Sequence, residues 1–170
     1  MEIKDIKAYK SKENSISNSQ ILFEDYNYKN AFIILKEILE SNVLSLTEKN
    51  LVKNHISLCI GYSKDVIKSS RASRKISNTT NLSKILLEKF TLLYDEIVNP
   101  NYPIRQIAIS FGNVKDEVYE QLNLFVDNEE AQKEKKVKEA LVVIRSKYGK
   151  NAVLKGMNLL EKATQKKEME

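Results

Sequence analysis

A cluster of basic residues in the middle of the chain has the charge to bind a polyanion. Residues 63–76 contain five basic side chains and one acidic side chain, Asp65, which gives a net charge of +4. Cations spaced this closely neutralise phosphates and release their counterions, so the cluster favours nucleic acid. A solvated surface loop is the alternative, and the small polar faces of the flanking strands favour nucleic acid over it. The basic residues are Lys64, Lys68, Arg71, Arg74 and Lys75.

The sequence contains no comparable group of residues that could carry out catalysis. Nucleotidyl transfer needs two or three carboxylates that converge on Mg²⁺. The acidic pairs, Asp95-Glu96 and Asp116-Glu117, lie in a predicted helix and a connector, where we interpret them as surface charge. The sequence has no GxxxxGK[ST] phosphate loop, and one histidine with one cysteine is too few for a metal cluster. We therefore predict a non-catalytic chain with no metal site and no cofactor of its own.

Residues 121–125, Gln-Leu-Asn-Leu-Phe, have the composition of a peptide ligand. Three large apolar side chains surround two polar ones, outside any domain that would bury all three. Peptide ligands concentrate their binding energy in a few buried anchors. We therefore predict that the segment is a ligand for a partner, with Leu122, Leu124 and Phe125 as its apolar anchors. The alternative is that these side chains pack on the domain's own helices or on the C-terminal tail.

The elements that position these residues follow from hydrophobic periodicity. Strands are expected at residues 15–22, 55–63, 75–80 and 104–113. A helix capped by Asp25 or Asn27 is expected to end near Leu44, and a polar turn follows at residues 47–54. Asn81 is expected to cap a second helix, which the prolines within residues 99–103 terminate. The order strand, helix, strand, strand, helix, strand (βαββαβ) predicts an α+β fold, a four-stranded and mostly antiparallel sheet with both helices on one face.

Two of the expected strands have one apolar face and one small polar face. Small polar side chains allow a sugar-phosphate backbone to come close, whereas an ordinary solvent-facing sheet would need no such partner. The apolar positions are Ile56, Leu58, Ile60 and Tyr62 in one strand and Ile107, Ile109 and Phe111 in the other. The opposite positions are Ser57, Cys59, Gly61 and Ser63, and Gln106, Ala108 and Ser110.

Two helical stripes are expected in the C-terminal tail. The first contains Val137, Leu141, Ile144 and Tyr148 and is followed by Gly149, a suitable C-cap. The second runs from Ala152 through Ala163. We expect two helices that pack against each other or dock on a partner.

Several of these stretches together resemble a known family. They are residues 12–20, 56–63, 78–81, the strand at 104–113 followed by Gln-Leu-x-Leu-Phe, and residues 144–149. In this order they resemble the C-terminal little-finger region of Y-family (UmuC-like, ImpB/MucB/SamB-type) lesion-bypass DNA polymerases.

The resemblance implies a DNA- and clamp-binding module that acts in translesion synthesis and the SOS response. It implies that Gln121, Leu122, Asn123, Leu124 and Phe125 bind the bacterial sliding clamp. It also implies sequence-nonspecific phosphate contacts to duplex DNA from the open sheet face. The matching positions are Ser17, Ser19, Ser57, Ser63, Lys75, Ser77, Arg105, Gln106 and Ser110. This chain departs from many relatives in having no glycine in residues 64–75 and in having Gln106 where they are often basic.

The same resemblance implies how the chain is divided. Residues 1–12 would be a linker from upstream catalytic domains. These domains would be a further partner of the chain, and they would bind the Mg²⁺ of the parent enzyme. Residues 13–113 would form the little-finger-like domain, 114–127 a connector with the clamp motif, and 128–170 a helical tail. A protein-interaction module that binds the clamp or another partner without holding DNA is the competing function. Salt-dependent DNA binding would separate the two.

Length and composition indicate the domain organisation and the cellular compartment to expect. The chain has 170 residues, 42% of them hydrophobic, and a net charge of +5, which suits one domain and an appendage. No apolar run approaches the ~20 residues that span a bilayer, and the N-terminus does not have the pattern of a signal peptide. The single cysteine, Cys59, excludes an internal disulfide and suits a reducing compartment. We expect a bacterial cytoplasmic protein associated with the nucleoid and not with a membrane.

Overall fold

The computed structural model describes residues 15–63, 67–116 and 128–164. Its elements are β1 (Ile16–Tyr26), α2 (Tyr28–Glu48), β2 (Leu51–Tyr62), β3 (Ser70–Thr80), α3 (Ser83–Ile97), β4 (Ile104–Gly112), β5 (Lys115–Asp116), α4 (Asn128–Tyr148) and the 3-10 helix η1 (Gly156–Leu159). The first six elements have the predicted order of strands and helices.

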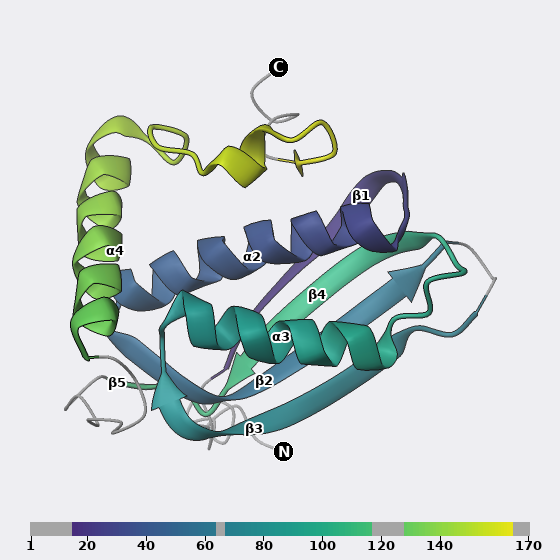
Figure 1. The fold of residues 1–170 in the computed structure, drawn as a ribbon, viewed down its shortest axis with the longest axis horizontal. Helices are drawn as coiled ribbons and strands as arrows, with labels where there is room; N and C mark the ends of the chain where they lie inside the picture. Colours follow the sequence, from purple (N-terminus) through teal and green to yellow (C-terminus); the bar gives the residue numbers. More distant parts are fainter. Residues whose placement is uncertain (1–14, 64–66, 117–127, 165–170) are drawn as a thin grey trace, which may run out of the picture.

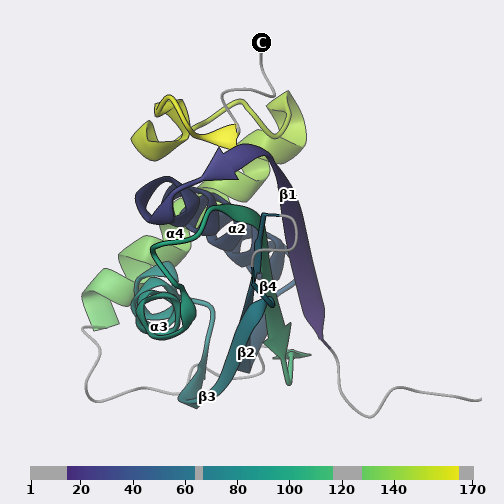
Figure 2. The same ribbon diagram turned by 90° about the vertical axis from the view of Figure 1, so that its right-hand side faces the viewer.

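The main sheet has the strand order β1-β4-β2-β3, and every neighbouring pair is antiparallel. The two-residue strand β5 pairs with the start of β2. Helices α2 and α3 both lie on one side of the sheet (Figures 1 and 2). The predicted α+β class, with two helices on one face and a helical element after them, is therefore confirmed.

The hydrophobic core lies between the sheet and these two helices. Alternate residues of β2 and β4 point into it, and Phe90 of α3 meets Phe111 of β4 edge to face, with ring centroids 5.9 Å apart. Each large apolar side chain buried in this way contributes roughly 1.5–3 kcal/mol. The predicted apolar faces of β2 and β4 are the buried faces: Ile56, Leu58, Ile60, Tyr62, Ile107, Ile109 and Phe111. Their small polar faces consequently lie on the side of the sheet opposite α2 and α3 (Figure 2), where the described residues place no helix, and we call this side the open face.

Helix α2 begins at one of the two predicted caps and ends later than predicted. Asn27 is its N-cap and accepts a hydrogen bond from the Asn30 N–H. The helix continues to Glu48 because Leu46 is buried and the Thr47 hydroxyl is satisfied by the Val43 carbonyl, so the predicted polar turn at 47–54 is wrong. The actual turn is Lys49-Asn50. Asn50 has φ of 50°, which reverses the chain sharply and lets β2 start at Leu51.

Strand β3 is longer than predicted and contains most of the basic cluster. Residues 70–75 pair with residues 60–55 of β2. The prediction of a loop up to residue 74 is therefore wrong, because pairing with β2 overrides the high polarity of this segment. Arg71, Arg74 and Lys75 are strand residues, and their side chains alternate between the two faces of the sheet.

The predicted cap of α3 is also wrong. Leu82, not Asn81, is the N-cap residue, and its side chain makes no capping bond. A residue from far along the chain satisfies the helix end: the Ser83 N–H donates to Oε1 of Glu134 in α4, at 2.6 Å. Asn81 instead donates to the Leu51 carbonyl at 3.4 Å and accepts from Lys138 at 3.0 Å.

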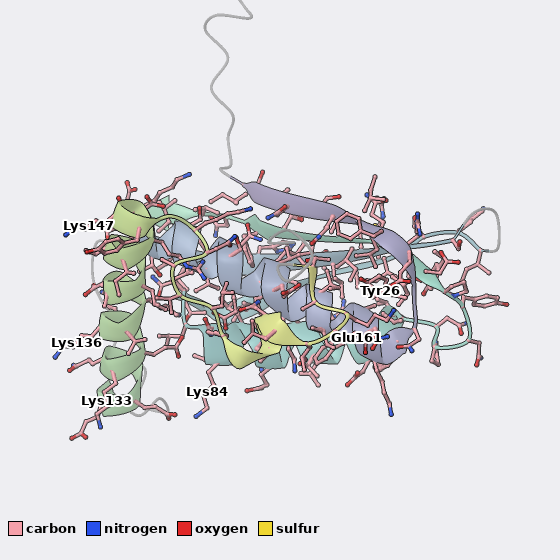
Figure 3. All side chains as sticks on the ribbon, turned by 90° about the horizontal axis from the view of Figure 1, so that it is seen from above. Tyr26, Lys84, Lys133, Lys136, Lys147 and Glu161 are labelled. Carbon is pink, nitrogen blue, oxygen red and sulfur yellow. The ribbon has the colours of Figure 1, made fainter. Side chains whose placement is uncertain are left out.

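Within the described residues 128–164, the first predicted stripe forms α4, and the second, residues 152–163, contains a short 3-10 helix in place of the predicted α-helix. Helix α4 ends as expected at Gly149, whose φ is +95° and whose N–H donates to the Arg145 carbonyl. After it the chain turns back along α2 (Figures 1 and 3), with only the short η1. Its polar groups bond to α2: Glu37 is buried and accepts from the Asn158 side chain and from both the N–H and the hydroxyl of Thr164. The second apolar stripe therefore belongs to a segment shaped by α2 and not to a helix. None of the helices in the described residues is both long and apolar enough to cross a bilayer.

Candidate nucleic-acid interface

Four serines form a row across the open face. Ser17 of β1 lies opposite Ser110 of β4, Ser110 lies opposite Ser57 of β2, and Ser57 lies opposite Ser73 of β3. Residues directly opposite each other point to the same side of an antiparallel sheet. With strands about 4.8 Å apart, this serine row spans roughly 14 Å. It gives the centre of the open face hydroxyl groups and little bulk.

Basic residues flank the serine row along β3. On one side of the row, the aligned residues of the four strands are Ser19, Ala108, Cys59 and Arg71. On the other side, the aligned residues of three strands are Gly112, His55 and Lys75. Arg71 and Lys75 are both exposed. The open face therefore has its positive charge on the β3 edge, next to the hydroxyls.

Gln106 is held in place on the open face. Its Nε2 donates to the Ser19 hydroxyl at 3.1 Å. Its side chain also lies against β2 at Gly61, where an added Cβ would come within 3.0 Å of the Gln106 Cβ. The glycine at 61 therefore leaves the space that Gln106 occupies.

Two of the predicted DNA contacts are paired with an acidic residue. The Ser63 hydroxyl donates to Asp25 at 2.9 Å, and Arg105 forms an ion pair with the same carboxylate at 3.7 Å. Asp25 reduces the positive charge at this end of the face. Beside it, Ile21 and Phe23 of β1 are 71% and 59% exposed, which makes the corner apolar as well.

Arg74 does not belong to the open face. It lies opposite Ile56, a core residue, and its guanidinium donates to both carboxylate oxygens of Glu96 in α3, at 2.6 and 2.8 Å. Arg74 was predicted to contact DNA together with Arg71 and Lys75, but alternation along β3 directs it to the helix side, so it lies apart from these two residues.

The remaining predicted residues are dispersed. Ser77 is an exposed residue of β3, and Lys68 is exposed just before that strand. Lys64 and the predicted clamp-binding residues Gln121, Leu122, Asn123, Leu124 and Phe125 lie outside the described residues. Ser73, which was not predicted, joins the site through the register. The alternation Arg71, Ser73, Lys75, Ser77 was the sequence signal for it.

Metal-binding and acid-base groups do not assemble on this face. Within the described ranges, no three His, Cys, Asp or Glu side chains lie close enough to hold a metal ion. What the described open face offers is a hydroxyl row, small side chains and two cations, and this combination suits a phosphate backbone.

Comparison with known proteins identifies the domain. Residues 13–124 match the impB/mucB/samB family C-terminal domain, a span of more than half of the chain. The chain belongs to this family. The sheet and helices α2 and α3 are accordingly the little-finger domain of a Y-family polymerase, as the sequence resemblance implied.

The chain is also similar to individual proteins. The chain is 33% identical over 147 residues to the "Putative UV-damage repair protein UvrX" of Bacillus subtilis (strain 168), an alignment that covers 85% of the chain and 34% of that protein. The chain thus spans about a third of that relative's length. Among solved structures, the little-finger domain of PolIV in complex with the β-clamp has a TM-score of 0.48 and 11% identity over 66% of the chain and all of the domain. The insertion ternary complex of Dbh DNA polymerase has a TM-score of 0.46 and 12% identity, covering 61% of the chain and 29% of the polymerase.

Proposed function

We propose that this little-finger domain binds duplex DNA, without sequence preference, through the open face of its sheet. The observation that supports the proposal most strongly is the serine row with Arg71 and Lys75 beside it. Serine hydroxyls donate to phosphate oxygens, and their small size lets the sugar-phosphate backbone approach the sheet. Arg71 and Lys75 neutralise phosphates, which contributes affinity and positions the duplex but does not distinguish bases.

The domain then acts as the DNA-holding part of a lesion-bypass polymerase. The whole enzyme would supply the carboxylates and Mg²⁺ for nucleotidyl transfer from a part of the protein outside this domain. The segment Gln121–Phe125 would tether the enzyme to the sliding clamp by burying its three large apolar side chains. With these roles, the domain itself would need no catalytic group.

A salt titration of DNA binding tests the proposal. Fluorescence anisotropy with a labelled duplex should show log affinity falling linearly with log salt concentration. Replacing both Arg71 and Lys75 with Gln should weaken binding and reduce the slope by about 0.9 for each lost phosphate contact. Arg74→Gln is the matched control, since it removes the same charge from the same strand on the helix side, and it should leave both affinity and slope unchanged. Equal effects of Arg71→Gln and Arg74→Gln would contradict the assignment of the open face.

A protein-interaction function without DNA is the second candidate, and the β1 corner favours it. Exposed Ile21 and Phe23 next to Asp25 suit a protein surface better than phosphates. If wild-type protein shows no salt-dependent DNA binding while it still binds the clamp, this second function is the one to retain.

A further inference from the structure

Helix α4 and the segment after it enclose a cavity against the domain, away from the open face. The cavity has a volume of about 420 Å³ and is lined by residues of α2, α3, α4 and the segment 153–158. Volumes of ~300–1,000 Å³ are typical of small-molecule sites. About half of its lining comes from α4 and the residues after it, beyond the part of the chain that matches the family. Figure 3 shows how α4 and the C-terminal segment frame α2 from two sides.

The walls of the cavity are largely apolar. Leu44 of α2, Leu87 of α3, Val137 and Leu141 of α4, and Leu154 contribute side chains to it. Val137 is 59% exposed, which places it where the cavity meets solvent. An apolar surface of this kind favours a ligand with a hydrocarbon body.

Most charged side chains that line the cavity are already neutralised. Glu40 pairs with Lys155 at 2.7 Å, Glu134 pairs with Lys138 at 2.5 Å, and Lys84 pairs with Glu130 at 2.9 Å. The carboxylate of Glu37 accepts three hydrogen bonds from Asn158 and Thr164. These groups therefore hold the elements together and leave little charge for a ligand.

Arg145 is the exception in the lining. Its Nη2 donates to the Val153 carbonyl at 3.0 Å, but no carboxylate of the described residues forms an ion pair with it. Its Nε is buried and has no hydrogen-bond acceptor among them. A buried donor on a charged group without an acceptor is unfavourable, and an anionic oxygen would satisfy it. The cavity thus combines an apolar body with one unneutralised guanidinium.

We propose that this cavity binds a small organic acid, with its hydrocarbon part against the leucine and valine walls and its carboxylate accepting hydrogen bonds from Arg145. Its lining residues come from the helices and the segment after α4, and none of them lies on the open face. Because the cavity exists only when α4 and the C-terminal segment are in place on α2, such a ligand also stabilises their attachment.

Octanoate is a suitable probe for the full chain, with octanol as its uncharged counterpart. In a calorimetric or NMR titration, octanoate should bind saturably and octanol should bind about tenfold more weakly, since it lacks the charge-assisted hydrogen bond. Arg145→Gln should remove this preference, so that the two compounds bind equally. Val137→Phe should reduce the affinity for both, because it fills the mouth of the cavity.

Val143→Phe is the matched control, because Val143 lies on the same helix, is 66% exposed and does not line the cavity. It should bind octanoate like the wild type. If Arg145→Gln loses its fold in a thermal melt, the comparison of Val137→Phe with Val143→Phe decides the location of the site. No saturable octanoate binding, equal binding of octanol to the wild type, or equal effects of the two valine substitutions would each overturn the proposal.

Discussion

At the scale of single residues, Lys53 is a basic side chain in an unfavourable environment. It is fully buried in β2, with Nζ 3.7 Å from the centroid of the Phe111 ring and no hydrogen-bond partner among the described residues. Burial, and secondarily the nearby charge of Lys138, lower the pKa of Lys53 from 10.5 to about 6. The face of the aromatic ring attracts a cation and offsets part of this desolvation.

The shifted pKa of Lys53 predicts a pH dependence of stability. Between about pH 6 and 10.5 the unfolded chain binds a proton that the folded chain does not, so the free energy of unfolding rises with pH. The slope is at most about 1.4 kcal/mol per pH unit. Lys53→Met should flatten this slope and raise stability at neutral pH, as measured by urea unfolding at several pH values. Lys133 is an exposed lysine of α4 (Figure 3), and Lys133→Met should leave the slope unchanged. If Lys133→Met also flattened the slope, the pH dependence would have to come from groups other than Lys53.

At the scale of elements, a residue of α4 caps the N-terminus of α3. Glu134 of α4 accepts from the N–H of Ser83 and pairs with Lys138, which in turn donates to the Asn81 carbonyl just before α3. A carboxylate at a helix N-terminus satisfies a free N–H and interacts favourably with the helix dipole. The docking of α4 and the start of α3 therefore depend on the same side chains.

Glu134→Ala should consequently destabilise the whole domain. It removes the cap of α3 and leaves Lys138, whose side chain is 7% exposed, without its carboxylate. We expect a loss of about 1–3 kcal/mol in unfolding free energy. Glu130→Ala is the control on the same helix. It breaks only an exposed pair with Lys84, so we expect a loss of well under about 1 kcal/mol. Similar losses for the two variants in chemical denaturation would show that Glu134 has no special role.

At the scale of the whole molecule, the predicted clamp ligand lies between two attached elements. The sheet ends at β5, which pairs with β2, and the described chain resumes in α4, which is docked on α2 and α3. Leu124→Ala combined with Phe125→Ala should abolish clamp binding in a calorimetric titration. The melting temperature should change by no more than a degree or two, because ligand side chains contribute little to the fold. If these residues were core, the pair would cost several kcal/mol and lower the melting temperature markedly.

The chain alone should incorporate no nucleotides. Its acidic residues form no cluster in the described ranges that could hold Mg²⁺, and nucleotidyl transfer requires such a site. A primer-extension assay with Mg²⁺ and all four nucleotides checks this expectation. Extension that persists through repeated purification would mean that catalytic carboxylates have been overlooked.

Much of the fold and part of the site could be predicted from the sequence, because they depend on neighbours along the chain. Alternation in residues 55–63 and 104–113 identifies the buried and open faces, since successive side chains in a strand point to opposite sides. Asn27, one of the two predicted caps of α2, and Gly149 act as caps because a helix end needs a local cap. Extending the same alternation back from Ile76 along residues 70–75 would have placed Arg74 on the helix side. The motifs that resemble the little-finger region, in their order along the chain, were sufficient to predict the family.

Tertiary structure alone decided what depends on partners distant in sequence. Strand order and register bring Ser17, Ser110, Ser57 and Ser73 into one row, and no local pattern specifies which strands are neighbours. The cap of α3 comes from Glu134, and residues 152–163 are held by Glu37 of α2 instead of forming a second α-helix. Short helices are marginal by themselves, so long-range hydrogen bonds and burial determine whether they form.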